Sequence, residues 1–322
     1  MPRYLFYLIS IFSLTAFSAF SQDTDFGPGY QSGIMKNPAL TGISGSGVFR
    51  MSYLNLFPGH NYNFHSVYTS FDSYFHEIHG GAGVYLSDDI IGGLVNDLRG
   101  AFSYSYFLQA EKDLYINAGL SAGFLRRGFN FRNAVLPDQI DPLGNISLPS
   151  SETLINDPRT LFDIGTGVVF VRGRYFGGFS VLHLTQPDLG TSGSAEDKLK
   201  RKYFVHVAAE YDIDRLKHLK LQPLAAGELQ GSYFSAYAGA VVETRFLAAN
   251  SLFLFNNNGD LDLQTGLSFR REQVTILYNY RFNLKSGNAL LPFSLSHQAG
   301  LAFNLNNVEK RIKVRTINLP SL

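Results

Sequence analysis

Catalytic motifs are missing from this 322-residue sequence. It contains no P-loop, no G-x-G-x-x-G and no G-x-S-x-G nucleophile elbow, and the segments 42–45 and 190–193 are only near misses to the last of these. The absence of Cys excludes thiolate metal sites and disulfides. We therefore predict that the protein is not an enzyme and binds no cofactor.

Two small clusters have side chains of the kind that bind cations. His76 and His79 flank Glu77, but this segment is predicted to be a turn, in which the imidazoles need not converge on one metal ion. Asp88 and Asp89 offer carboxylate oxygens that suit a hard cation. Adjacent acidic residues are more typical of a solvated external loop, so we predict no metal site at either place.

The elements that position these residues are predicted from an alternation of period two, which gives each strand one apolar and one polar face. Between residues 114 and 124, for example, apolar side chains alternate with small or polar ones. Fourteen segments show such a pattern. They are residues 45–56, 61–73, 79–87, 96–109, 113–125, 161–170, 174–184, 202–212, 219–228, 232–242, 245–254, 260–270, 272–283 and 296–306.

The connections between these segments differ in length at the two ends of the strands. Long connections, such as 126–160 and 185–201, follow odd-numbered strands, and short ones follow even-numbered strands. Bacterial outer-membrane barrels have long extracellular loops and short periplasmic turns, and closure leaves no unpaired backbone in lipid. We predict an all-β fold, a transmembrane antiparallel up-and-down β-barrel of about 14 strands. A secreted β-sandwich is the alternative.

The N-terminus has the features of a secretory signal peptide over residues 1–21, with one cation, an apolar run and a small-residue cleavage region. We expect residues 22–44 to be a periplasmic or lumen-plugging segment, 45–306 the barrel and 307–322 a periplasmic tail. Lys and Arg number 27 against 26 Asp and Glu, and loss of Arg3 with the signal peptide cancels the difference. A neutral chain has no field that gathers nucleic acid, so we predict no nucleic-acid partner.

Four ionisable side chains fall on the polar faces of predicted strands. Between residues 203 and 211 the outward set is apolar, which leaves His206 and Glu210 inside the barrel. Asp163 and Arg281 hold equivalent positions in their own strands. These side chains could line a hydrophilic path or seat the N-terminal segment, but ordinary packing of a narrow, water-bearing lumen is the interpretation that we favour.

An ordered set of short motifs resembles the PorP/SprF family of type IX secretion system outer-membrane proteins. The set covers almost the whole chain between residues 23 and 306. Its members are segments 37–42 (NPALTG), 62–66, 79–89, 123–127, 138–142, 162–165, 178–187 and 201–203. Residues 53–61 lack the Trp that is usual in the family, so the contacts of the first external loop do not carry over.

The resemblance implies an outer-membrane component of the type IX system, with roles in protein secretion and gliding motility in Bacteroidetes. Implied partners are a cargo protein with a C-terminal sorting domain, such as an adhesin, the translocon, periplasmic ring components and outer-membrane lipid. Export and surface attachment both remain open. Passive transport of small or hydrophobic solutes remains open as a different function, because a barrel of this size encloses a lumen in which residues 22–42 could form a plug.

The longest connection, residues 126–160, is the predicted docking site for partners. Two prolines stiffen its segment 136–143, so we expect it to be ordered. Together with neighbouring loops it would form an external surface that receives the sorting domain. The same sequence features would also fit a lid that only covers the barrel mouth. The predicted contact residues are Asp88, Asp89, Asp138, Gln139, Asp141, Gln186 and Asp188.

Overall fold

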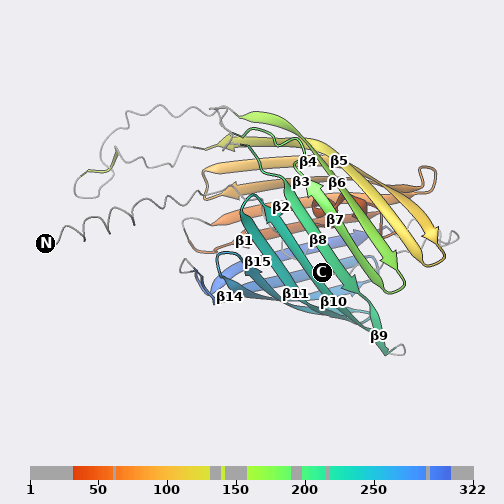
Figure 1. The fold of residues 1–322 in the computed structure, drawn as a ribbon. Coiled ribbons are helices and arrows are strands. Elements are labelled where there is room, and N and C mark those ends of the chain that lie inside the picture. The colour runs from red at the N-terminus through yellow and green to blue at the C-terminus, as the bar shows by residue number, and fades with distance from the viewer. Residues whose placement is uncertain are drawn as a thin grey trace, which may run out of the picture.

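The computed structural model describes residues 32–60, 63–130, 139–141, 158–189, 198–214, 218–287 and 291–305. Within these residues, all the strands form one antiparallel sheet that closes on itself (Figure 1). The strands are β1 (Val48–Leu56), β2 (Phe64–Phe75), β3 (Gly80–Ile91), β4 (Val95–Glu111), β5 (Leu114–Phe129), β6 (Arg159–Arg172), β7 (Tyr175–Leu182), β8 (Lys202–Ala209), β9 (Tyr211–Asp214), β10 (Leu219–Gln230), β11 (Tyr233–Glu243), β12 (Leu247–Asn256), β13 (Leu261–Arg271), β14 (Val274–Lys285) and β15 (Ser294–Asn304).

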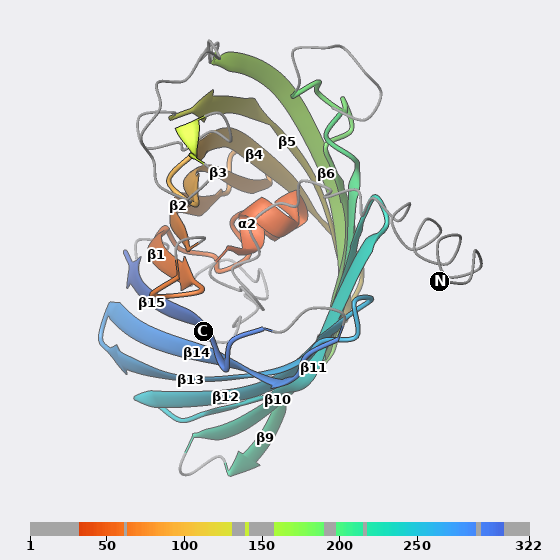
Figure 2. The same cartoon turned by 90° about the vertical axis from the view of Figure 1, so that its left-hand side faces the viewer.

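Closure joins the first and last strands. β1 pairs with β15 from Val48 opposite Asn304 to Leu56 opposite Ser296. β8 and β9 both pair with β10 and are separated only at Glu210, so they form one interrupted strand. The fifteen segments therefore make a closed barrel of fourteen strands, seen end-on in Figure 2, and the predicted fold class is confirmed.

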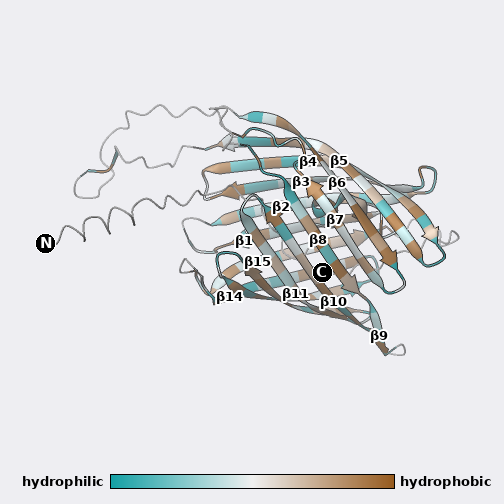
Figure 3. Ribbon diagram, in the orientation of Figure 1, coloured by the Kyte–Doolittle hydropathy of each residue, from teal (hydrophilic) through white to brown (hydrophobic). Residues whose placement is uncertain are grey.

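The two faces of the sheet differ as the alternation predicts. In β8, Val205 and Val207 point outward and are exposed, whereas Phe204 and His206 point inward and are buried. The ribbon in Figure 3 shows hydrophobic and hydrophilic residues interspersed along the strands. The outward apolar side chains suit lipid, and every strand finds a partner on both sides, as a bilayer requires.

Connection lengths follow the prediction at the longest connections, although residues 231–232 make a two-residue turn at the same end. Two-residue turns join β4 to β5, β6 to β7 and β13 to β14, whereas residues 130–158 and 183–201 connect strands at the opposite end. By the general rule for bacterial barrels the short turns face the periplasm, which places the start of β1 and the end of β15 on that side. We call the opposite end the outer end.

One predicted loop is wrong. β3 continues to Ile91, pairing with β2 and β4 over its whole length, so Asp88 and Asp89 belong to a strand and not to an external loop. The connection that follows has only three residues, 92–94. Pairing on both sides compensates for the weak strand preference of two consecutive Asp residues.

Two short helices, α2 (Gly33–Lys36) and η1 (Pro38–Leu40), precede β1. Within the described ranges, no helix has the length and apolar character needed to span a bilayer.

Candidate functional site

A segment of the chain lies inside the barrel. Residues 32–43, which we call the lumen segment, precede β1 and contain α2 and η1, and Figure 2 shows α2 within the ring of strands. Asn37, Ala39 and Thr41 have no solvent-exposed surface. A segment buried to this degree belongs to the core of the barrel.

The segment's own side chains shape its turn. Asn37 caps η1 by accepting the backbone N–H of Ala39 on Oδ1, at 3.0 Å. Pro38 takes the first helical position, where its missing N–H costs nothing. Thr41 closes the turn by donating its hydroxyl to Pro38 O at 2.7 Å. Residues 37–41 therefore form a compact turn that satisfies much of its own backbone.

Hydroxyl groups of the barrel wall satisfy two further carbonyls of the segment. Ser105 donates to Thr41 O at 2.6 Å, and Ser180 donates to Lys36 O at 2.6 Å. The hydroxyls of Thr41 and Ser103 lie 2.8 Å apart. Because a buried carbonyl without a partner is costly, these serines fix the segment to β4 and β7.

An ion pair fixes the periplasmic end of the segment. The backbone N–H of Gly42 donates to Oδ2 of Asp72 at 2.8 Å, while the other oxygen of Asp72 accepts from Arg50. Arg50 also donates to the hydroxyl of Ser44 at 3.2 Å. One buried carboxylate thus holds both the segment and the wall strand that follows it.

Three wall glycines allow the segment's backbone to approach the sheet directly. A Cβ at Gly119 would lie 2.3 Å from Ala39 N, and one at Gly81 would lie 2.1 Å from Thr41 O. Both distances are far below any real contact, so every side chain larger than hydrogen is excluded. We call this surface the glycine track; it consists of Gly81, Gly119 and Gly167.

Strands β6 and β8 also contact the segment. Nδ2 of Asn37 donates to Val168 O at 3.4 Å and lies 3.5 Å from Nε2 of His206. His206 itself stacks against Phe204 with ring centroids 5.4 Å apart. His206 therefore points into the lumen and forms part of the seat of the segment.

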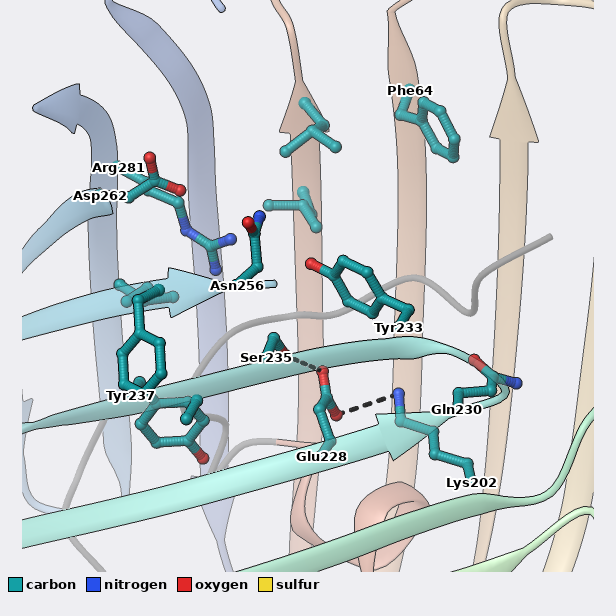
Figure 4. A pocket seen from close by; sticks show the side chains of 15 residues that line it. Phe64, Lys202, Glu228, Gln230, Tyr233, Ser235, Tyr237, Asn256, Asp262 and Arg281 are labelled. Carbon is teal, nitrogen blue, oxygen red and sulfur yellow. Dashed lines mark hydrogen bonds and ion pairs between the residues drawn. The ribbon is translucent and has the colours of Figure 1, made fainter. Parts of the chain in front are cut away.

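Two buried lysines lie beside one carboxylate at the end of α2. Nζ of Lys202 lies 3.1 Å from Oε2 of Glu228, and Nζ of Lys36 lies 4.0 Å from the same atom. Ser235 donates to the other oxygen of Glu228 at 3.2 Å (Figure 4). Lys36 also lies 5.4 Å and 5.7 Å from the ring centroids of Phe204 and Tyr237. Helix α2 therefore ends in an ionic cluster that includes the wall.

A cavity of about 180 Å³ adjoins this cluster at the outer end of the barrel. We call it the outer cavity. Its polar lining, drawn in Figure 4, comes from the starts of β8, β11 and β13 and the ends of β10, β12 and β14. Its labelled polar residues are Lys202, Glu228, Gln230, Tyr233, Ser235, Tyr237, Asn256, Asp262 and Arg281.

A second ionic network lies on β3, β4 and β5. Arg127 donates to both oxygens of Asp97, at 2.7 Å and 2.6 Å, and Arg99 lies 3.6 Å from Asp97 and 4.0 Å from Asp89. Asp89 and Asp97 are buried. Asp89 therefore lies inside the barrel, whereas Asp88, on the opposite face of β3, accepts from Nδ2 of Asn96 at 2.7 Å. The two carboxylates cannot form one surface.

The other predicted contact residues are only partly described. Gln139 and Asp141 are half-buried, and Asp138 lies outside the described residues, as does most of the connection predicted to be ordered. The backbone N–H of Gln186 donates to His183 O at 3.1 Å, and Asp188 forms an isolated β-bridge with Lys198. The predicted docking surface therefore stays a prediction, except at Asp89, which lies in the buried ionic network and not on an external surface.

The remaining residues predicted for the lumen also have polar partners. Asp163 lies 2.6 Å from Nδ1 of His183, and Glu210 accepts from Lys220 at 2.8 Å. Arg281 donates to Oε1 of Gln264 at 3.3 Å and lines the outer cavity. In the described part of the chain, no group of three His, Asp or Glu side chains could hold a metal ion; His76 and His79 lie in the exposed turn between β2 and β3.

Among the residues that seat the lumen segment, His206 is the one that the sequence singles out, with seating of the N-terminal segment as one of two open interpretations. Motif 37–42 was noted for its resemblance, not for its chemistry, and Asp72, Glu228 and the glycine track were not singled out. A signal existed for Glu228, which stands at an inward position between Ala226 and Gln230, where a carboxylate needs a buried partner.

Comparisons with known proteins give a family and a fold. A family model described as type IX secretion system membrane protein PorP/SprF matches residues 18–307. No curated protein is significantly similar in sequence. Among solved structures, the chain is similar to a TodX deltaS2S3 mutant monoaromatic hydrocarbon channel, with a TM-score of 0.53 and 10% identity over 86% of this chain and 94% of that one.

Two other solved barrels align less well. The P. putida toluene transporter TodX has a TM-score of 0.47 and 10% identity, over 83% of this chain and 90% of that one. The Acinetobacter baumannii outer membrane protein Omp33 has a TM-score of 0.41 and 10% identity, over 82% of this chain and 100% of that one. At 10% identity, the similarity to the TodX deltaS2S3 mutant supports the barrel fold but no activity, and the other two are too dissimilar to support a conclusion.

Proposed function

Because the chain belongs to the PorP/SprF family of type IX secretion system membrane proteins, we propose that it binds secreted cargo in the outer membrane. In this proposal the barrel aids export or surface attachment of a cargo, such as an adhesin, by binding its C-terminal sorting domain. The translocon and periplasmic ring components are the proposed partners on the inner side. The protein itself is an outer-membrane component of this system.

The observation that best supports a binding role is the occupied lumen. Wall hydroxyls, Asp72 and the glycine track hold the lumen segment, and a permanently open channel would not have these contacts. A plugged transporter would share them, so conductance has to be measured to separate the two functions. A barrel filled by its own chain presents its outer surface, rather than a water path, to other molecules. Connections 130–158 and 183–201 both join strands whose ends lie at the outer end, where a cargo would arrive.

The test combines a deletion strain with a shortened barrel. Deleting the gene should remove one secreted protein from the medium or from the cell surface. Replacing residues 138–156 by a Gly-Ser link should then reproduce this loss, while heat-modifiable migration on a gel shows that the barrel still folds. A folded, shortened barrel that displays its cargo at wild-type levels would exclude this connection as the docking site.

Passive transport is the second candidate function, and the outer cavity at the mouth of the lumen is the observation that favours it. A conductance measurement on the purified barrel in planar bilayers separates the two. The binding role predicts closed wild-type barrels and open conductance only after residues 22–43 are deleted. Open conductance of the wild-type barrel would favour transport.

A further inference from the structure

Three wall side chains form a site of recognisable chemistry around the Lys36 ammonium. Glu228 of β10 contributes a carboxylate, and Phe204 of β8 and Tyr237 of β11 contribute aromatic rings whose centroids lie within 6 Å of Nζ. A carboxylate combined with ring faces attracts alkylammonium groups, because ring quadrupoles and the anion both favour a cation. All three wall residues are buried, so the site is shielded from water.

Of the two lysines beside Glu228, Lys36 is the more distant. The 4.0 Å between Nζ of Lys36 and Glu228 exceeds the 3.1 Å between Lys202 and the same oxygen. Charge-assisted N–H···O contacts are normally about 2.7–2.9 Å long, so Lys36 makes the weaker of the two contacts. What places Lys36 here is the anchoring of the lumen segment, including the bond from Ser180 to the Lys36 carbonyl.

The site has a second approach. Glu228 and Tyr237 contact Lys36 on one side and line the outer cavity on the other. Figure 4 shows both side chains at the cavity wall, with Lys202 beside Glu228. A cation that enters through the cavity would therefore reach the same carboxylate that Lys36 reaches from the lumen segment.

We propose that Glu228, Phe204 and Tyr237 form a binding site for a primary alkylammonium group, occupied by Lys36 in the resting chain. The ligand class is a lysine side chain on a partner polypeptide that enters through the outer cavity and exchanges with Lys36. The site does not depend on which cargo the barrel serves, or on whether it serves one, because a small cation is sufficient to occupy it.

The test is chemical rescue of Lys36→Ala, which empties the site and leaves room for a ligand. The probe is n-butylammonium added to the purified barrel in detergent at constant ionic strength, with n-butyrate as the opposite-charge control. The readouts are direct binding by calorimetry and the temperature at which the barrel unfolds on semi-native gels. Lys220→Ala is the matched control, because Lys220 also pairs with a glutamate, at 2.8 Å, but both side chains are partly exposed.

Butylammonium should bind Lys36→Ala saturably and raise its unfolding temperature, and it should leave Lys220→Ala unchanged. Adding Glu228→Gln to Lys36→Ala should weaken binding by roughly tenfold or more, since the carboxylate is lost. A short peptide with one lysine should bind as butylammonium does, and its norleucine counterpart should not. If Lys36→Ala fails to fold alone, the yield of refolded barrel with butylammonium, compared with butyrate, becomes the readout.

Two results would overturn the proposal. One is the absence of saturable binding or rescue in Lys36→Ala. The other is equal binding by Lys36→Ala with and without Glu228→Gln, which would mean that the cation binds elsewhere.

Discussion

Gly119 in β5 is the direct cross-strand partner of Gly167 in β6, and the lumen segment packs against the inner face of the wall at this pair. Glycine in a strand interior normally weakens the sheet, because it has no side chain to pack. Here the missing side chains create the space that Asn37 and Ala39 occupy. The weakness of the strands at this point is offset by the packing of another part of the chain.

The first prediction tests that packing. Gly119→Ala would place a Cβ 2.3 Å from Ala39 N, so the segment must shift at a cost of about 1–3 kcal/mol. The chain has no Cys, so Ile34→Cys adds a single buried thiol to the lumen segment. The rate at which maleimide labels this thiol reports displacement of the segment. Maleimide labelling should be roughly 5- to 150-fold faster in the Ala variant. Gly128→Ala in the same strand, whose nearest atom would be 4.0 Å away, should leave the rate unchanged.

The second prediction compares two glycines with positive φ. Gly42, at φ 72°, would bring a Cβ to 2.5 Å from Gly81 Cα, whereas Gly59, at φ 81°, has nothing within 4 Å. Both Ala variants suffer the left-handed backbone penalty of about 1–2 kcal/mol, but Gly42→Ala adds a clash of about 1–3 kcal/mol. The free energy of unfolding in urea measures the difference. Equal losses at the two positions would show that Gly42 is not constrained by the wall.

The third prediction concerns the ionic network on β3, β4 and β5. Arg127→Ala leaves the buried Asp97 with Arg99 at 3.6 Å as its remaining ion pair, so we expect a loss of about 3–5 kcal/mol of stability. Lys220→Ala removes a partly exposed pair and should cost about 0–1 kcal/mol. Unfolding in urea distinguishes them. A loss under 1 kcal/mol for Arg127→Ala would contradict the assigned role.

The fourth prediction tests the faces of β14. Ile276 is 56% exposed on the outside, whereas Thr275 points inward. Ile276 is the third residue of its strand, so a Lys there lies between interface and midplane and should cost about 1–2 kcal/mol. Thr275→Lys should be tolerated. The folded fraction in lipid vesicles measures both, and greater damage from the Thr275 change would mean that the strand is shifted by one residue.

The alternation of apolar and polar residues predicted the strands of the wall well, because contact with lipid imposes this alternation on each strand separately. β8 illustrates this: Val205 and Val207 face outward as the alternation requires, whichever strands lie beside them. Asp88 and Asp89 could not be placed in the same way, since Asp89 depends on Arg99 of the neighbouring strand. The contacts that hold the lumen segment were harder still to predict from the sequence. Asn37 and His206 are 169 positions apart, and no periodicity connects them.

The contacts of the lumen segment also constrain the order of assembly. Asp72, Ser103, Gly119 and Val168 all belong to the first six strands, so residues 37–42 can be bound before anything beyond Arg172 has been added. The seam between β1 and β15, in contrast, cannot form until the last strand arrives. The first six strands can therefore hold residues 37–42 through these four contacts before the seam closes, whereas the contacts of Lys36 and Asn37 with Ser180, His206 and Glu228 form only when β7, β8 and β10 have been added.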